Sequence, residues 1–137
     1  MQGSAQVILV VDDHHDTANV ISEMLELSGY DSYTAYNSLD ALRLYETLRP
    51  SLVLTDETLT DSVTGSDLLR VLRHKYGSGV GRAVFLTGSP KSVTCLPTDL
   101  VLEKPIDFET LVAAVRTVLG EPPAAREADE PYDEPYM

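Results

Sequence analysis

The segment Ser51–Gly65, SLVLTDETLTDSVTG, starts as an apolar run and changes character abruptly at Asp56. Residues 52–55 form a short run of three apolar residues and a threonine, two of them β-branched. Such a run is typical of a strand buried on both faces of a sheet. After the acid pair Asp56 and Glu57 the chain is polar and shows no helical periodicity before Gly65. The segment therefore predicts a buried strand that carries a carboxylate at its end, followed by an irregular loop.

Similar short apolar runs lie on both sides of this segment and alternate with stretches of helical periodicity. Strands are predicted at residues 7–11, 31–36, 52–55, 83–86 and 100–102, and helices at residues 16–27, 39–48, 67–72 and 107–119. Strands that alternate with helices imply right-handed crossovers and a parallel sheet covered on both faces. The predicted fold class is α/β, in the form of a small doubly wound domain.

Polar residues follow four of the five predicted strands. They are Asp12 and Asp13, then Asp56, Thr87 and Lys104. Because ligands of such sheets bind outside the carboxyl ends of the strands, these side chains are expected to converge. Three crowded carboxylates repel one another unless a hard cation lies among them, and Mg²⁺ with phosphate oxygens suits such a site. A carboxylate can then attack phosphorus while the lysine neutralises charge on the transferring oxygens.

Four motifs at these strand ends resemble those of the response regulator receiver domains of two-component signal transduction. In chain order they are VVDDHH, LVLTD, VFLTG and LEKP, and the resemblance covers residues 5–120. It implies a flavodoxin-like sheet of five parallel strands in the order 2-1-3-4-5. It also implies a phosphoryl group on Asp56, received from a histidine kinase or a histidine phosphotransfer protein.

The resemblance also implies a role for each remaining polar residue. Asp13 and Asp56 would bind Mg²⁺ together with the backbone carbonyl of Thr58, and Asp12 would act largely through metal-bound water. The hydroxyl of Thr87 and the ammonium of Lys104 would contact the phosphoryl group.

The chain departs from the usual receiver pattern in two places. Gly65 comes nine residues after Asp56, so this loop is one residue longer than usual, and Thr60 stands where a proline is expected. The interval between Thr87 and Lys104 is short and contains two prolines with little helical pattern between them. The fourth helix is therefore predicted to be shortened or replaced by a loop. Val101 takes the place of the aromatic residue that moves with the switch threonine in many members.

Composition narrows the class of partner. The 137 residues carry a net charge of −12, which argues against nucleic acid because phosphate backbones are bound by clustered Lys and Arg. No apolar run is long enough to span a membrane and the start does not resemble a signal peptide, so a cytoplasmic location is expected. Residues 121–137 are acidic and rich in proline, and are predicted to be a disordered tail that either solubilises the domain or docks on a partner.

Two histidines and one cysteine receive structural interpretations. His14 and His15 follow the acid pair and could be ligands, but they are expected to lie in the turn that enters the first helix. Asp12 and Asp13 could instead simply cap that helix. Cys95 is expected to be structural.

The predicted function is that of a phosphoacceptor, with no enzymatic activity beyond self-phosphorylation and self-dephosphorylation. The chain would act as a single-domain regulator, as a relay or as the receiver of a hybrid kinase, on a downstream protein that the sequence does not identify. One alternative is a pseudo-receiver that serves only as a binding module. A less favoured alternative is an aspartyl-nucleophile phosphatase, whose second aspartate is replaced here by Thr58.

Overall fold

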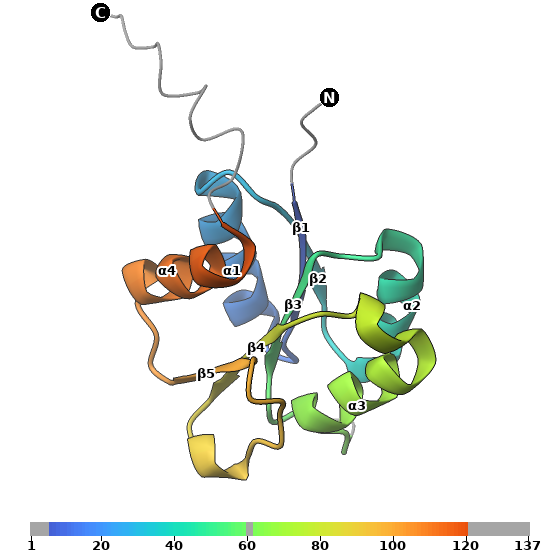
Figure 1. Cartoon of the computed structure of the whole chain (residues 1–137). Coiled ribbons are helices and arrows are strands. Elements are labelled where there is room, and N and C mark those ends of the chain that lie inside the picture. Colours follow the sequence, from blue (N-terminus) through green and yellow to red (C-terminus); the bar gives the residue numbers. More distant parts are fainter. Residues whose placement is uncertain (1–5, 60–61, 121–137) are drawn as a thin grey trace, which may run out of the picture.

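Five parallel strands form a single sheet in the order β2-β1-β3-β4-β5 (Figure 1). The computed structural model describes residues 6–59 and 62–120, so Thr60 and the predicted tail at 121–137 lie outside the described part. The strands are β1 Val7–Val11, β2 Asp31–Ala35, β3 Leu52–Asp56, β4 Ala83–Thr87 and β5 Leu100–Glu103. The flavodoxin-like strand order implied by the family resemblance is confirmed.

Helices cover both faces of the sheet. They are α1 His15–Leu27, α2 Ser38–Leu48, α3 Gly65–Tyr76 and α4 Phe108–Leu119. Figure 1 shows α1 and α4 together on one face, and α2 and α3 on the other. None of the helices in the described ranges is both long enough and apolar enough to cross a membrane.

The core is divided by the sheet into two layers. Leu9, Val53 and Phe85 pack toward α2 and α3, whereas Ile8 and Leu54 pack toward the layer of α1 and α4. Successive side chains of a strand point to opposite faces, so a central strand covered on both sides must be apolar throughout. This requirement explains why the apolar runs in the sequence are continuous and do not alternate.

Helix α1 uses only part of its apolar surface for the core. Ala18, Ile21 and Leu25 are buried, whereas Val20 is 49% and Leu27 is 79% exposed. At 3.6 residues per turn the first three share one narrow stripe, and Val20 and Leu27 lie on the opposite side of the helix. The helical spacing in the sequence is therefore real, but two of its apolar residues face outward.

Side-chain caps fix the starts of three helices. Asn37 accepts a hydrogen bond from the amide of Asp40, and Asp107 accepts one from Thr110. Thr64 and Asp67 form a reciprocal capping box at α3. Such caps satisfy amide groups that the first helical turn leaves free.

The segment between β4 and β5 contains only a short 3-10 turn, η2 Pro90–Ser92, which confirms the prediction that the receiver family's fourth helix is shortened or replaced by a loop. The helix labelled α4 follows β5 and is the one predicted at residues 107–119. Asp99 fixes the end of this segment. Its carboxylate accepts two hydrogen bonds from Arg73, at 2.8 and 3.0 Å, and one each from the amides of Ala83 and Leu96. This buried ion pair, in which both carboxylate oxygens accept hydrogen bonds, ties the end of the loop to α3 and to the start of β4.

Candidate functional site

Three carboxylates meet at the carboxyl ends of β1 and β3, which are neighbours in the sheet. Asp56 is the last residue of β3, and Asp12 and Asp13 directly follow β1. Donor atoms of these three side chains and of His14 all lie within 4.8 Å of one another. Asp12 is only 1% exposed and Asp56 only 4%, so these two carboxylates are largely shielded from water. The predicted convergence of the three acids is therefore present.

Two oxygens of this cluster point to a bound cation. Asp12 Oδ1 accepts a hydrogen bond from the amide of His14 at 2.9 Å. Asp12 Oδ2 and Asp13 Oδ1 are buried, and within the described residues they accept no hydrogen bond. Buried carboxylate oxygens without partners are costly, and a divalent ion would satisfy them. The residues fit Mg²⁺, which Asp12, Asp13 and Asp56 would hold.

Lys104 brings a positive charge to the same place. Its Nζ lies 3.2 Å from Asp56 Oδ1, and its backbone amide donates to the carbonyl of Thr87 at 2.8 Å, which continues the pairing of β5 with β4. The peptide bond between Lys104 and Pro105 is cis. Sheet pairing thus places the ammonium beside the carboxylate that the sequence marked as phosphoacceptor.

The pKa of Asp56 is raised above its usual value. Burial is the main cause and the charge of Asp12 adds to it, while Lys104 and the amide of Thr58 lower the pKa in part. Lys104 alone therefore does not compensate for the burial and crowding of the acids.

The two threonines occupy their predicted places, but their roles stay predictions. The amide of Thr58 donates to Asp56 Oδ1 at 3.4 Å, and it is the carbonyl of Thr58 that is predicted to face the metal. Thr87 is buried at the end of β4, next to Leu86, which pairs with Asp56. Its hydroxyl accepts a hydrogen bond from the amide of Ser89.

Gly65 allows α3 to start close to the acidic edge. A Cβ atom at this position would lie 2.5 Å from the carbonyl oxygen of Asp56 and 3.0 Å from the side chain of Thr55. The amide of Gly65 donates to the carbonyl of Glu57 at 2.9 Å. A glycine is thus needed because the backbone of the helix approaches the backbone of β3, even with the longer loop between them.

A buried acid next to the phosphoacceptor position was not foreseen from the sequence. Glu57 is 4% exposed, and its carboxylate accepts hydrogen bonds from the amide and the hydroxyl of Ser66 at 2.8 and 2.9 Å. The Ser66 hydroxyl in turn accepts from the amide of Thr94, in the loop after β4. Because neighbouring strand residues point to opposite faces, Glu57 could have been assigned to the face opposite Asp56, where it needs a buried partner.

The histidines lie in the predicted turn, but they differ. His14 is the N-cap residue of α1 without a capping side-chain bond, so neither Asp12 nor Asp13 is the cap. His14 Nδ1 lies 3.4 Å from an oxygen of each aspartate. His15 instead stacks on Tyr36, with ring centroids 3.7 Å apart.

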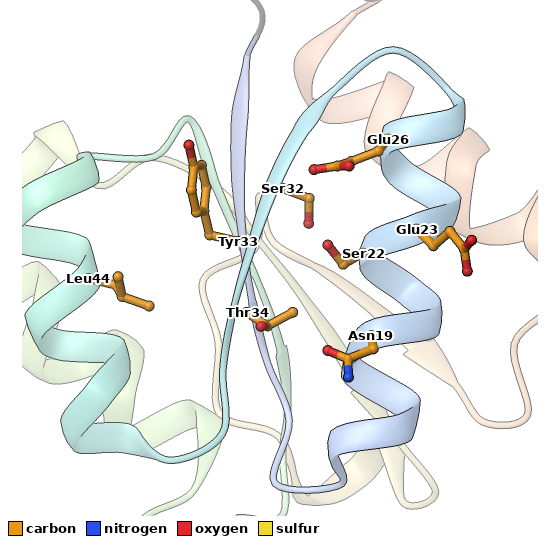
Figure 2. A pocket seen from close by; sticks show the side chains of 8 residues that line it. All are labelled: Asn19, Ser22, Glu23, Glu26, Ser32, Tyr33, Thr34 and Leu44. Carbon is orange, nitrogen blue, oxygen red and sulfur yellow. The ribbon is translucent and has the colours of Figure 1, made fainter.

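Two of the surface hollows lie beside α1. One, of about 500 Å³, lies between α1 and the edge strand β2 and is lined by none of the predicted site residues (Figure 2). In Figure 2, Ser32 and Thr34 of β2 point toward α1, and Tyr33 points to the other side. The other hollow, of about 590 Å³, lies beside Lys104 and is lined mainly by apolar side chains of α1 and of the chain between β5 and α4. Only this second hollow adjoins the acidic edge.

Known proteins to which this chain is similar are response regulators. The family model described as response regulator receiver domain matches residues 8–116. The chain is 34% identical over 138 residues to the DNA-binding response regulator MtrA of Mycobacterium tuberculosis, covering 97% of this chain and 57% of that protein. MtrA of Mycobacterium leprae is 34% identical over 133 residues, with 93% and 55% covered. The chain thus spans little more than half the length of these relatives.

Solved structures agree with this match. A receiver domain from Methylobacillus flagellatus, described as CheY-like, superposes with a TM-score of 0.75 at 28% identity and covers 84% of this chain and 99% of that one. The response regulator PhyR of Brucella abortus gives a TM-score of 0.72 at 25% identity over 92% of this chain and 51% of its own. The chain belongs to the family of response regulator receiver domains.

Proposed function

We propose that the protein is a phosphoacceptor of two-component signalling and that Asp56 receives the phosphoryl group from a phosphohistidine. A carboxylate oxygen of Asp56 attacks phosphorus, the phosphorus–nitrogen bond breaks, and the electron pair and a proton return to the imidazole of the donor. Lys104 stabilises negative charge on the phosphoryl oxygens, and Thr87 donates its hydroxyl to one of them. Bound Mg²⁺ supplies a further positive charge to those oxygens.

The observation that carries this proposal is the placement of Lys104 Nζ 3.2 Å from Asp56, beside two acids with unsatisfied buried oxygens. A surface ion pair alone would not need Asp12 and Asp13. A structural acid cluster alone would be expected to have its oxygens hydrogen-bonded by protein groups. The combination of a reactive carboxylate, a lysine and oxygens left open for a cation suits phosphoryl transfer.

The apolar hollow beside Lys104 is the proposed docking place of the phosphohistidine donor, a histidine kinase or a histidine phosphotransfer protein. Val20 and Met24 of α1 line it together with Pro105 and Ile106. Val20 is 49% exposed, so part of its apolar side chain is open to a partner that enters this hollow.

We further propose that the chain acts on a downstream protein without nucleic-acid contacts of its own, in the cytoplasm, and that it is no enzyme beyond gaining and losing its own phosphoryl group. The phosphatase alternative lacks support, because Thr58 offers no acid and the carboxylate of Glu57 is committed to Ser66. A general acid must be able to reach the leaving group.

Intact mass spectrometry tests the proposal directly. Incubation with Mg²⁺ and acetyl phosphate should add one phosphoryl group to the wild-type protein and none to Asp56→Asn. Asp31→Asn, which changes an exposed aspartate at the edge strand, is the matched control and should be modified like wild type. If neither acetyl phosphate nor a phosphorylated histidine protein modifies the wild type, the pseudo-receiver is the better description.

A further inference from the structure

We propose that His14 is a fourth ligand of the metal at the acidic edge, so that this site binds imidazole-favouring divalent ions such as Zn²⁺ more tightly than its carboxylates alone would. The inference rests on the proposed metal site and adds a nitrogen donor to it. It concerns which ions the site accepts.

The backbone holds His14 at the mouth of the acid cluster. Its amide donates to Asp12 Oδ1 at 2.9 Å, and its own backbone is extended at the start of α1. The imidazole points its Nδ1 inward, 3.4 Å from Asp12 Oδ1 and 3.4 Å from Asp13 Oδ1. The ring nitrogen thus lies close to both carboxylates, so one cation could be bound by the nitrogen and by both aspartates.

The donor atoms have nearly the spacing that one ion requires. Those of Asp12, Asp13, His14 and Asp56 all lie within 4.8 Å of one another. Opposite ligands of a small divalent ion are separated by about 4.2 Å, twice a bond of about 2.1 Å. The His14 side chain is 72% exposed, so its ring can move toward the ion without disturbing the core.

The unsatisfied oxygens are the independent sign that a ligand belongs here. Asp12 Oδ2 and Asp13 Oδ1 are buried and accept no hydrogen bond from the described part of the chain. Although His14 Nδ1 is near Asp13 Oδ1, the two atoms do not form a hydrogen bond of good geometry. His14 Nδ1 already lies within hydrogen-bonding distance of Asp12 Oδ1, at 3.4 Å. An ion among these atoms would satisfy the two open oxygens and would replace that contact by coordination of the ring nitrogen.

An imidazole changes the selectivity of an oxygen site. Mg²⁺ prefers oxygen ligands and gains little from nitrogen, whereas Zn²⁺ and the other late divalent ions are bound well by imidazole. His14 should therefore contribute to Zn²⁺ binding much more than to Mg²⁺ binding. A cysteine or a second histidine at the cluster is not required.

His15 provides a matched control. It is the next residue, but its ring stacks on Tyr36 at an interplanar angle of 18°, and it is not among the donors of the cluster. The hydroxyl of Tyr36 donates to Asn19, which fixes the ring on which His15 lies. Removal of His15 deletes a histidine from the same turn without removing a donor.

The test is calorimetric titration of the full chain with Mg²⁺ and, separately, with Zn²⁺. His14→Ala should lose at least about tenfold in Zn²⁺ affinity, while its Mg²⁺ affinity changes by less than about twofold. His15→Ala should match wild type for both ions. In long-range proton–nitrogen NMR spectra, Zn²⁺ should shift the Nδ1 resonance of His14 and leave that of His15 unchanged.

The outcomes separate this inference from the proposed function. Equal Zn²⁺ affinity in His14→Ala and wild type, an equal change for both ions, or an equal loss in His15→Ala would overturn the role of His14 and leave phosphorylation of Asp56 untouched. Absence of binding of either ion to wild type would overturn the metal site, and with it this inference.

Discussion

Aspartates are buried at both ends of the parallel strands, but their carboxylates have different numbers of hydrogen-bond partners at the two ends. At the amino-terminal edge of β5, both oxygens of Asp99 accept two hydrogen bonds each, from Arg73 and from two backbone amides. At the carboxyl edge, Asp12 and Asp13 each keep a buried oxygen that no described residue satisfies. A carboxylate whose oxygens all accept hydrogen bonds holds the surrounding structure in place, whereas a carboxylate with an open oxygen can bind an ion. Burial alone therefore does not distinguish the two kinds of aspartate, whereas the number of hydrogen bonds that each carboxylate accepts does.

The largest expected effect is a loss of stability when Asp99, at the amino-terminal edge of β5, is replaced. Asp99→Ala would leave the amides of Ala83 and Leu96 without their acceptor. It would also remove the anionic partner of Arg73, whose guanidinium would keep its hydrogen bond to the carbonyl of Gly81. The loss should be about 3 to 5 kcal/mol of unfolding free energy, the usual cost of removing one partner of a buried pair. Urea denaturation measures it.

The control for this prediction breaks an exposed pair. Arg43 lies 3.7 Å from Asp40 at the surface of α2, so Arg43→Ala should cost no more than about 1 kcal/mol. Similar losses in Asp99→Ala and Arg43→Ala would show that the buried pair contributes no more than a surface pair.

The next effect is on metal binding at the open edge. Asp13→Ala should lower Mg²⁺ affinity by at least about 10- to 100-fold, since it removes a proposed ligand. The metal-free variant should be no less stable than wild type, because one of three repelling carboxylates is gone. Calorimetry for Mg²⁺ and thermal unfolding in a chelator give both values. Undiminished Mg²⁺ affinity would exclude Asp13 as a ligand.

A smaller effect is expected for the link between the two loops at this edge. Ser66→Ala removes the hydroxyl that bonds Glu57 and accepts from the amide of Thr94, and should cost about 1 to 2 kcal/mol. Exchange of the Thr94 amide with deuterium should become faster. Ser92→Ala, which removes an exposed hydroxyl bonded to the carbonyl of Ser89, should leave stability nearly unchanged. Equal exchange rates of the Thr94 amide in Ser66→Ala and wild type would show that the hydroxyl of Ser66 does not hold the loop after β4 in place.

Most of the fold could be read from the sequence because each element satisfies its local rules. The first three residues of the strand at 52–56 are apolar because helices cover both of its faces. Asn37, Thr64 and Asp107 begin helices for reasons that involve only neighbouring residues. The strand order needed the family resemblance, because local patterns do not determine which strands pair.

Parts of the site could not be read from the sequence because they depend on contacts between distant residues. Glu57 and Thr94 meet only through Ser66, and Asp99 is satisfied only because α3 brings Arg73 to it. The inward orientation of the His14 ring likewise depends on where Asp12 lies after folding. The sequence does place Asp56 and Lys104 at strand ends, and parallel pairing then brings them together.

The smallest expected effect is a pH dependence that arises at Asp56. Burial and the charge of Asp12 raise its pKa, so the folded protein keeps this proton at a pH where the unfolded chain has lost it. Stability of the metal-free protein should therefore fall as pH rises from about 4 through the raised pKa. Asp56→Asn should lack this fall, and its unfolding temperature relative to wild type should rise by a few degrees across the window.

Other acids do not obscure this difference. The pKa values of Asp67 and Asp107 are lowered, mainly by hydrogen bonds at the caps they form, so their contribution to stability is lost as pH falls. Both are present in wild type and in Asp56→Asn, so the difference between the two proteins isolates Asp56. Thermal unfolding between pH 4 and pH 7, in a chelator and then in Mg²⁺, measures it. Added Mg²⁺ should reduce this fall of stability in wild type. The positive ion would stabilise the ionised carboxylate of Asp56, which burial and the negative charge of Asp12 otherwise disfavour. A constant difference at every pH would mean that the open edge tolerates an ionised Asp56 as easily as the unfolded chain does.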